Sequence, residues 1–383
     1  MKTIARRSAF ALSALVVALL WTTVSTDAAG PGGRGYYLTR NGFRTPVYGV
    51  AATRDTSGNI SAACAALTTV QVDAARIGRQ LSRSMVTSSP QAVIRGPEGG
   101  ATFDIRYTDA DGTGFNATAT GATRRRAFEA ALTAWTKVLH ADQPFRVEAT
   151  MHEMSDGDDD PDTFLLATAG PSEFWLIENK IVPSALSWQM LGGRYDDAGE
   201  SDISVNVNDQ INWDYRIDGL SAHDKSSLMY TLMHELGHGL GLIDSFDDEN
   251  GKVMNDPLPF VFDPFVNRGS SRRNRLMDHA AAESKRDMTS RDVYFNGDSA
   301  SVASKAHNRP SAMIKLYAPD PYEPGSSISH VDQSSYEENR DSPALMTPYI
   351  GTGSDKIDKL TLGIMKDLGY QLVPNAATTR APQ

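Results

Sequence analysis

The sequence predicts an α+β fold, and the order of its expected elements is the main reason. Alternating apolar and polar residues predict strands, whereas apolar residues at helical spacing predict helices. Along the 383-residue chain these signals occur in the order strand, helix, strands, helix, long irregular region and final helix. This order is typical of α+β domains. We therefore expect a mixed sheet packed against helices.

Three strands are expected where apolar and polar residues alternate. Phe103, Ile105 and Tyr107 alternate with polar residues in "ATFDIRYTD", as they would in a half-buried strand. The stretch "DISVNVND" at residues 202–209 shows the same pattern. Between them, "PFRVEATM" at residues 144–151 is expected to form the third strand.

Helices are expected at residues 122–140 and 358–370, where apolar side chains recur at helical spacing. Thr123 is the expected N-cap of the first helix, and Gly369 is expected to end the second. A further helix is expected within residues 59–85, in a region rich in Ala, Gly, Ser and Thr.

A fourth helix is expected to run through "TLMHELGHGLG". Ser221, followed three residues later by Asp224, resembles a capping box at its start. Residues 174–193, ahead of this helix, have a mixed pattern and are expected to be loop-rich. Behind it, residues from about 245 to 327 are rich in Gly, Pro, Asp, Asn and Ser and predict a long loop-rich insertion.

The N-terminal residues predict export. A basic start, "MKTIARR", an apolar run and small residues near position 29 are typical of a secretory signal peptide. We expect a secreted, extracellular protein, with the periplasm and a retained N-terminal anchor as alternatives. The apolar run is too short for a comfortable membrane span. The expected parts are a signal peptide at 1–29, an N-terminal extension or propeptide at 30–100, a dense domain at 101–372 with an insertion at about 245–327, and a disordered tail at 373–383.

Charge and cysteine content narrow the function classes further. The formal net charge is −10 and no Lys/Arg block resembles a nucleic-acid-binding surface, so this function class is disfavoured. Cys64 is the only cysteine, so no intrachain disulfide can form. The acidic run at residues 155–162 is a candidate Ca²⁺ site, but it lacks EF-hand spacing and a solvated turn is the alternative.

The stretch "TLMHELGHGLGLIDSF" carries the strongest chemical signal. His234 and His238 are four residues apart, so one helical turn places both imidazoles on the same side, where they can reach one metal ion at about 2.0–2.1 Å. Glu235 is displaced around the helix and can act on a metal-bound water, as in the HExxH motif of zinc hydrolases. Gly241 follows where the HExxHxxG pattern requires a sharp turn. The alternative is a surface helix with two unrelated histidines.

A third ligand is needed, because a catalytic zinc ion usually has three protein ligands and one open position. Asp244 lies at a spacing at which short zinc-binding motifs place that ligand. His330 is the distant alternative, in the small-residue loop "YEPGSSISHVD", which lets the backbone approach a buried site. The residues by themselves leave both candidates open.

The combination of "HELGHGLG", "GSSISH", "ALMTP" and "LTLGIMKDLGY" resembles secreted bacterial zinc metallopeptidases of the metzincin clan with a leishmanolysin-like layout. In those proteins the third histidine follows a long insertion. The resemblance therefore implies that His234, His238 and His330 bind one catalytic Zn²⁺ and that Glu235 is the catalytic base. It also implies that Met346 is the methionine of the turn beneath the metal.

The implied function is that of a secreted zinc-dependent endopeptidase acting on protein or peptide substrates. It would hydrolyse peptide bonds through a zinc-bound water and Glu235 as general base. By analogy, residues 202–209 would form the upper edge of the cleft and pair with an extended substrate. The alternative is a secreted adhesion or interaction protein whose metallopeptidase-like domain is inactive or uses zinc structurally. Oligomeric state is left open.

Regulation by the N-terminal region is a further hypothesis. Cys64 could block the zinc as a thiolate in a latent precursor. The alternative is a small residue on one face of the alanine-rich helix expected at residues 59–85.

Overall fold

The computed structural model describes most of the chain from residue 90 onward and four short stretches before it. The predicted signal peptide at 1–29, the acidic run at 155–162 with its candidate Ca²⁺ site, and the tail beyond residue 374 lie outside the described residues. Among the residues that are described, no helix has the length and apolarity needed to cross a bilayer. The described residues are 36–38, 44–46, 48–54, 60–66, 90–154, 163–193, 201–222, 224–306, 313–336, 344–349 and 353–374.

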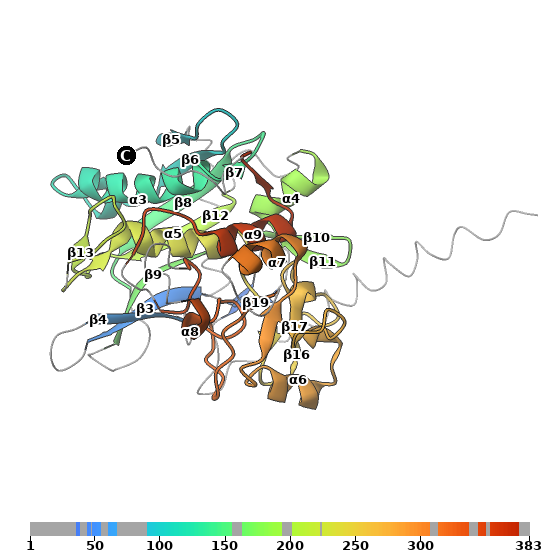
Figure 1. Ribbon diagram of the computed structural model, residues 1–383. Helices are drawn as coiled ribbons and strands as arrows, with labels where there is room; N and C mark the ends of the chain where they lie inside the picture. Colours follow the sequence, from blue (N-terminus) through green and yellow to red (C-terminus); the bar gives the residue numbers. More distant parts are fainter. Residues whose placement is uncertain are drawn as a thin grey trace, which may run out of the picture.

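A seven-stranded mixed sheet forms the centre of the fold (Figure 1). Strands β6, β8 and β12 run parallel to one another, whereas β5, β9, β3 and β4 are antiparallel to the neighbours with which they pair. This arrangement confirms the α+β fold with a mixed sheet. In spatial order the strands are β4 (Ile60–Ala66), β3 (Tyr48–Arg54), β9 (Thr163–Pro171), β12 (Ile203–Asn208), β8 (Phe145–His152), β6 (Thr102–Tyr107) and β5 (Ala92–Arg95).

The three strands predicted from alternation are confirmed as β6, β8 and β12. Their apolar side chains alternate into the core, as Phe103 and Ile105 do in β6. The expectation that residues 202–209 form an exposed cleft edge is wrong, because β12 is hydrogen-bonded to β9 on one side and to β8 on the other. A strand whose two edges are both paired cannot accept a substrate strand.

The N-terminal part of the sheet was not expected. The helix predicted at residues 59–85 is wrong where the chain is described, because Ile60–Ala66 form β4. Every residue of β4 pairs with β3, so tertiary pairing overrides the weak helical preference of this alanine-rich stretch. Cys64 pairs with Val50 across the two strands. The side chain of Cys64 lies outside the described residues, so its role as a switch stays a prediction.

Helix α3 (Gly121–Thr136) packs beside α5 (Leu228–Gly239) on the sheet (Figure 1). The predicted α3 cap at Thr123 is wrong, because helical hydrogen bonding already begins with the N–H of Arg124 donating to the carbonyl of Thr120. The indole N–H of Trp135 donates to the carbonyl of Met233 at 3.1 Å and so ties the two helices together.

Helix α5 begins later than the capping-box pattern suggested. Ser227 is its N-cap and accepts a hydrogen bond from the N–H of Tyr230 at 3.2 Å. Ser226–Ser227 form β14 and pair with β13 (Trp213–Asp214), which holds the chain extended immediately before the helix. The predicted start at Ser221 is therefore wrong.

Residues 174–193 are more regular than expected. They form a hairpin of β10 (Phe174–Ile177) and β11 (Lys180–Pro183), followed by α4 (Ser184–Leu191). The two hairpin-loop residues, Glu178 and Asn179, both have positive φ, at 50° and 59°. A two-residue turn of this kind usually contains glycine, and here no glycine marks it in the sequence.

The predicted insertion consists of short elements joined by loops. Helix α9 (Lys359–Leu368) follows it and confirms the predicted C-terminal helix: Asp358 is its N-cap and Gly369, at φ 120°, its C-cap. The remaining elements are β1 (Tyr36–Leu38), β2 (Arg44–Pro46), η1 (Gly114–Asn116), β7 (Leu139–His140), β15 (Phe246–Asp247), β16 (Lys252–Val253), η2 (Asp263–Phe265), β17 (Val266–Arg268), η3 (Leu276–Asp278), α6 (Ala281–Asp287), β18 (Val293–Phe295), α7 (Asp298–Ala306), β19 (Ile314–Lys315), α8 (Gln333–Tyr336) and β20 (Gln371–Leu372).

Candidate metal centre

Three histidines from distant parts of the chain meet at one point. His234 and His238 lie on α5, and His330 lies in the loop after β19. All three side chains are fully buried. Their Nε2 atoms are separated by 3.2 Å (His234 to His238), 3.2 Å (His238 to His330) and 3.3 Å (His330 to His234).

The spacing of the three nitrogens matches a tetrahedral metal ion. With bonds of about 2.0–2.1 Å, two ligands of a tetrahedral zinc ion are about 3.3–3.4 Å apart. The observed separations of 3.2–3.3 Å are close to that value. The three imidazoles would therefore supply three of the four ligands of such an ion. The fourth coordination position would be left for a ligand other than these histidines.

Hydrogen bonds at the other ring nitrogen fix the tautomer of each imidazole. The Nδ1 atom of His234 lies 2.8 Å from the carbonyl oxygen of Leu345, that of His238 lies 2.7 Å from Leu242, and that of His330 lies 2.9 Å from Ser326. A carbonyl only accepts, so each Nδ1 carries the hydrogen. Backbone carbonyls orient metal-binding histidines in the same way.

The three converging Nε2 atoms therefore all carry lone pairs when the rings are neutral. Burial lowers the pKa of His234 to about 4 and holds the pKa values of His238 and His330 well below the ordinary value. Neutral rings with this tautomer cannot donate to one another. Three acceptors this close repel each other unless a cation lies between them, so the donor set fits a metal ion.

Two backbone conformations bring the ligands together. Gly241 has a φ of 102°, and a Cβ at this position would lie 2.7 Å from Pro183, so only glycine lets the chain turn so tightly after α5. In the other loop, the buried Ile328 has a φ of 71°. A β-branched residue in this region is strained, and such strain is concentrated at functional sites.

The predicted base, Glu235, lies beside this cluster and is fully buried. Its Oε2 accepts a hydrogen bond from the N–H of Ala169 in β9 at 2.8 Å, whereas Oε1 accepts none from the described residues. Burial raises the pKa of the Glu235 carboxyl well above its ordinary value, and hydrogen bonds from the backbone of Ala169 and Val50 lower it. No sequence signal could have identified these two backbone donors, because they come from neighbouring strands.

Of the other two residues considered from the sequence, Met346 lies under the histidine-bearing helix and Asp244 lies outside the ligand cluster. Met346 is fully buried beneath α5, where a Cβ on Gly237 would lie 2.6 Å from its sulfur. It thus packs under the helix that carries the histidines. Asp244 is not part of the ligand cluster, and its carboxylate accepts a hydrogen bond from the N–H of Phe246 at 2.8 Å.

A second group of ligand-type side chains, formed by His279, Glu283 and Asp287, is less suited to a metal. The two ring nitrogens of His279 are already engaged, with Asp287 and with Asn274, both at 2.8 Å. Arg268 also pairs with Asp287 at 3.1 Å, which places a positive charge where a metal ion would bind.

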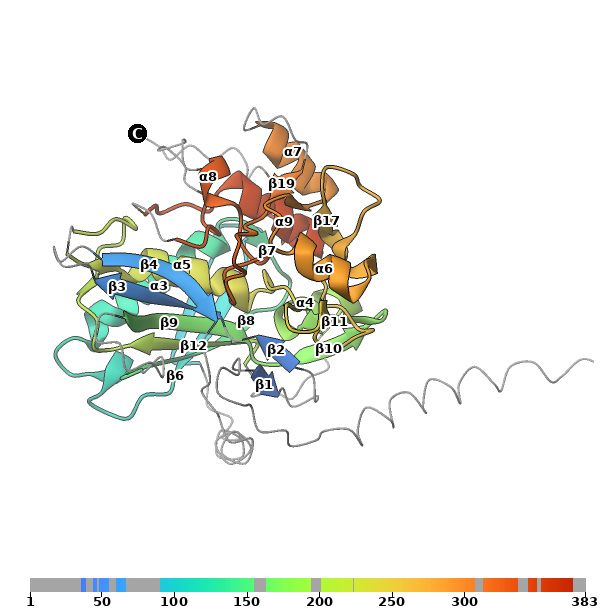
Figure 2. The ribbon, with the colours of Figure 1, turned by 90° about the horizontal axis from the view of Figure 1, so that it is seen from below.

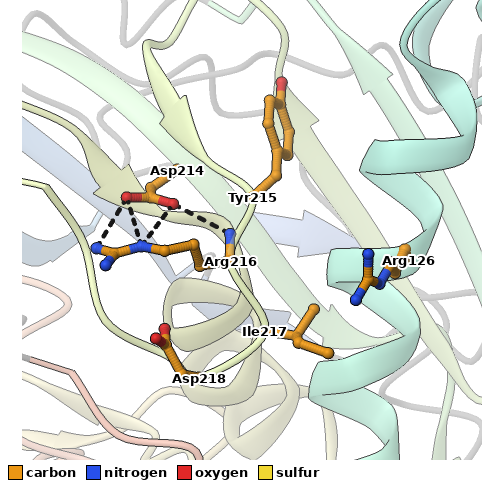
Figure 3. Close-up of a pocket in the computed structure, with 6 residues that line it drawn as sticks. All are labelled: Arg126, Asp214, Tyr215, Arg216, Ile217 and Asp218. Carbon is orange, nitrogen blue, oxygen red and sulfur yellow. Dashed lines mark hydrogen bonds and ion pairs between the residues drawn. The ribbon is translucent and has the colours of Figure 1, made fainter.

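A surface pocket of about 480 Å³ lies away from the candidate residues, between α3 and the loop after β13 (Figure 3). An ion pair between Arg216 and Asp214, at 3.0 Å, occupies one side of it. None of the histidines or Glu235 reaches it. Its lining residues are Arg126, Asp214, Tyr215, Arg216, Ile217 and Asp218.

Asp263 anchors the segment that follows α5. Its carboxylate accepts hydrogen bonds from the N–H of Ser245 at 3.0 Å, the hydroxyl of Ser245 at 2.5 Å and the N–H of Phe260 at 2.7 Å. Burial raises the pKa of Asp263 to about 7, although these hydrogen bonds lower it. The folded state therefore holds this proton more tightly than the unfolded state does.

This difference predicts a loss of stability on the alkaline side. The contribution of the protonated carboxyl is complete below pH about 4 and disappears as the pH rises to about 7. Across this pH range the free energy of unfolding should fall by about 4 kcal/mol, at about 1.36 kcal/mol per pH unit. Urea unfolding at pH 5 and pH 8 should show this slope in the wild type and a much smaller one in Asp263→Asn. Equal slopes in the two proteins would contradict it.

Comparison with known proteins gives one partial match to a protein-family model. A protein-family model described as SPBPB7E8-like matches residues 109–273, which is less than half of the chain. The matched region includes α5 and ends before His330. No curated protein and no solved structure matches the chain.

Proposed function

We propose that this chain is a secreted zinc-dependent endopeptidase with a metzincin-like catalytic domain. The observation that carries the proposal is the triangle of three Nε2 atoms, 3.2–3.3 Å apart, with the buried Glu235 next to His234 on the same helix. His234, His238 and His330 hold the zinc ion, and Glu235 is the general base.

The proposed reaction is hydrolysis of a peptide bond. Zinc at this site supplies Lewis acidity to the attacking water and to the peptide carbonyl. Glu235 takes a proton from the water, and the water oxygen bonds to the carbonyl carbon. When the C–N bond breaks, Glu235 passes this proton to the departing amine. The unpartnered Oε1 of Glu235 is the atom suited to receive it.

Access to the site requires a change at the edge of the sheet. Strand β3 pairs antiparallel with β9 (Figure 2). The backbone of Val50 in β3 hydrogen-bonds to Glu235. If β3 leaves, β9 becomes a free edge next to Glu235. An extended peptide can then add to β9 by strand pairing. In this proposal the N-terminal region acts as a propeptide.

A structural zinc site is the second candidate, and the complete burial of the histidines favours it. Structural zinc sites, however, almost always have four protein ligands. Among the described residues the ligand cluster contains three histidines and no fourth side chain. This donor set favours catalysis.

The proposal is tested by casein hydrolysis before and after limited proteolysis of the N-terminal region. Activity that is lost with a zinc chelator and restored by Zn²⁺ supports a peptidase. A protein that binds zinc stoichiometrically yet never cleaves casein, with or without the N-terminal region, would support the structural or adhesive alternative.

The third ligand is tested by a pair of substitutions. His330→Ala is expected to reduce bound zinc from one ion per chain to nearly none, because two imidazoles alone hold zinc weakly. Asp244→Ala should retain zinc, since Asp244 lies outside the ligand cluster. Metal analysis of the two purified variants decides between them, and loss of zinc only in Asp244→Ala would reverse the assignment.

A further inference from the structure

The carboxylate of Asp358 connects helix α9 to the segment that holds the candidate metal ligands. Its Oδ2 accepts hydrogen bonds from the N–H of Leu345 at 2.7 Å and from the hydroxyl of Thr361 at 2.7 Å. Its Oδ1 accepts from the N–H groups of Leu360 at 2.9 Å and Thr361 at 3.1 Å. Asp358 is buried, and all four bonds lie within the protein.

The segment beginning at Leu345 contacts both ligand-bearing elements. The carbonyl of Leu345 accepts the hydrogen of His234 Nδ1 at 2.8 Å. The carbonyl of Met346 accepts from the N–H of Val331, next to His330, at 2.8 Å. The carbonyl of Leu345 thus orients the imidazole of His234 directly. The adjacent carbonyl of Met346 holds the backbone immediately after His330.

We propose that Asp358 is a positioning residue for the zinc site, acting through Leu345. By holding the Leu345 N–H, it fixes the direction of the Leu345 carbonyl, and this carbonyl fixes the tautomer and the ring orientation of His234. This inference rests on the proposed zinc site. It assigns to Asp358 a role beyond capping α9.

The two roles of Asp358 use different atoms and can be separated. Capping needs one oxygen that accepts from Leu360 or Thr361, and serine is as good an N-cap as aspartate. The hydrogen bond to Leu345 needs the second carboxylate oxygen. Asp358→Ser therefore retains an acceptor for the helix terminus and loses the connection to Leu345.

Asp367 provides a matched control on the same helix. Its carboxylate accepts from the N–H groups of Ser299 at 2.9 Å and Ala300 at 2.8 Å, at the start of α7. Like Asp358, it accepts hydrogen bonds from backbone N–H groups at the N-terminus of a helix, in this case α7. Neither of these two hydrogen bonds involves Leu345 or a histidine.

The experiment compares zinc affinity, measured by competition with a chromophoric chelator, and the visible absorption spectrum of the Co²⁺-loaded protein. Asp358→Ser is expected to weaken zinc binding by about 10–100-fold, as loss of such orienting partners does, and to change the Co²⁺ spectrum. Asp367→Ser should leave both unchanged. Urea unfolding of the metal-free proteins reports the capping contribution separately.

The outcomes distinguish this inference from the proposed function. If the wild type binds no zinc, the proposed function fails. If the wild type binds zinc and Asp358→Ser binds it equally well with the same Co²⁺ spectrum, Asp358 is only a helix cap and the inference is overturned. Asp358→Asn is the second variant in case the serine variant does not fold. It keeps the shape of the side chain, and as an N-cap it directs its amide oxygen to the helix N–H groups. Its NH₂ group then faces the Leu345 N–H and cannot accept from it, so the same loss of affinity is expected.

Discussion

Replacing Glu235 with glutamine is expected to reduce casein hydrolysis by about 10²–10⁴-fold while zinc remains bound, because a general base of this kind contributes a factor of that size. Glutamine has nearly the same shape but cannot accept the proton of the attacking water. The three imidazoles that hold the metal are unchanged, and Glu235 is not one of the ligands. The expected result is therefore a protein with one zinc ion and almost no activity.

The measurement needs a form in which the site is open, so both proteins are assayed after limited proteolysis of the N-terminal region. Glu249→Gln is the matched control, since Glu249 is an exposed residue in the turn between β15 and β16. It should retain full activity and full zinc content. A fully active Glu235→Gln protein would refute the mechanism. Loss of zinc from that variant would show that Glu235 contributes to metal binding.

Local signals predicted the part of the site that lies within one element. His234, Glu235 and His238 share α5, and a single helical turn sets their relative positions. The same holds for β6 and β12, where alternation alone identified the buried face. Periodicity is a property of neighbouring residues, so a sequence shows it directly.

Interactions between distant segments were not visible in the sequence. Nothing near Asp358 indicates that its carboxylate reaches Leu345, or that β12 is covered on both sides. The small-residue loop made His330 a candidate ligand, but only the family resemblance favoured it over Asp244. Residues 60–66 became a strand because β3 offers a complete set of backbone partners. Such pairing depends on the register of two strands, and composition does not encode it.

Gly49→Ala is expected to increase casein hydrolysis by the full-length chain. A Cβ on Gly49 would lie 2.6 Å from Cγ2 of Thr168 and 2.9 Å from the carbonyl oxygen of Ala167, both in β9. The methyl group therefore forces β3 away from β9. Overpacking of this kind costs about 1–3 kcal/mol, and at about 1.4 kcal/mol per tenfold change the open population should rise by about 5- to 150-fold. The rate of hydrolysis should follow, because opening exposes Glu235.

Gly193→Ala is the matched control for this prediction, because a Cβ at Gly193 has no atom within 4 Å and the same chemical change is harmless there. The two possible roles of β3 predict opposite changes in casein hydrolysis for Gly49→Ala. If β3 is a removable cover, Gly49→Ala gains activity even though its edge of the sheet is destabilised, and added protease gives it little further activation. If β3 belongs to the working fold, the variant loses activity in proportion to its loss of stability. The sign of the change, measured together with hydrogen exchange at β9, therefore decides whether strands β3 and β4 regulate the site or complete it.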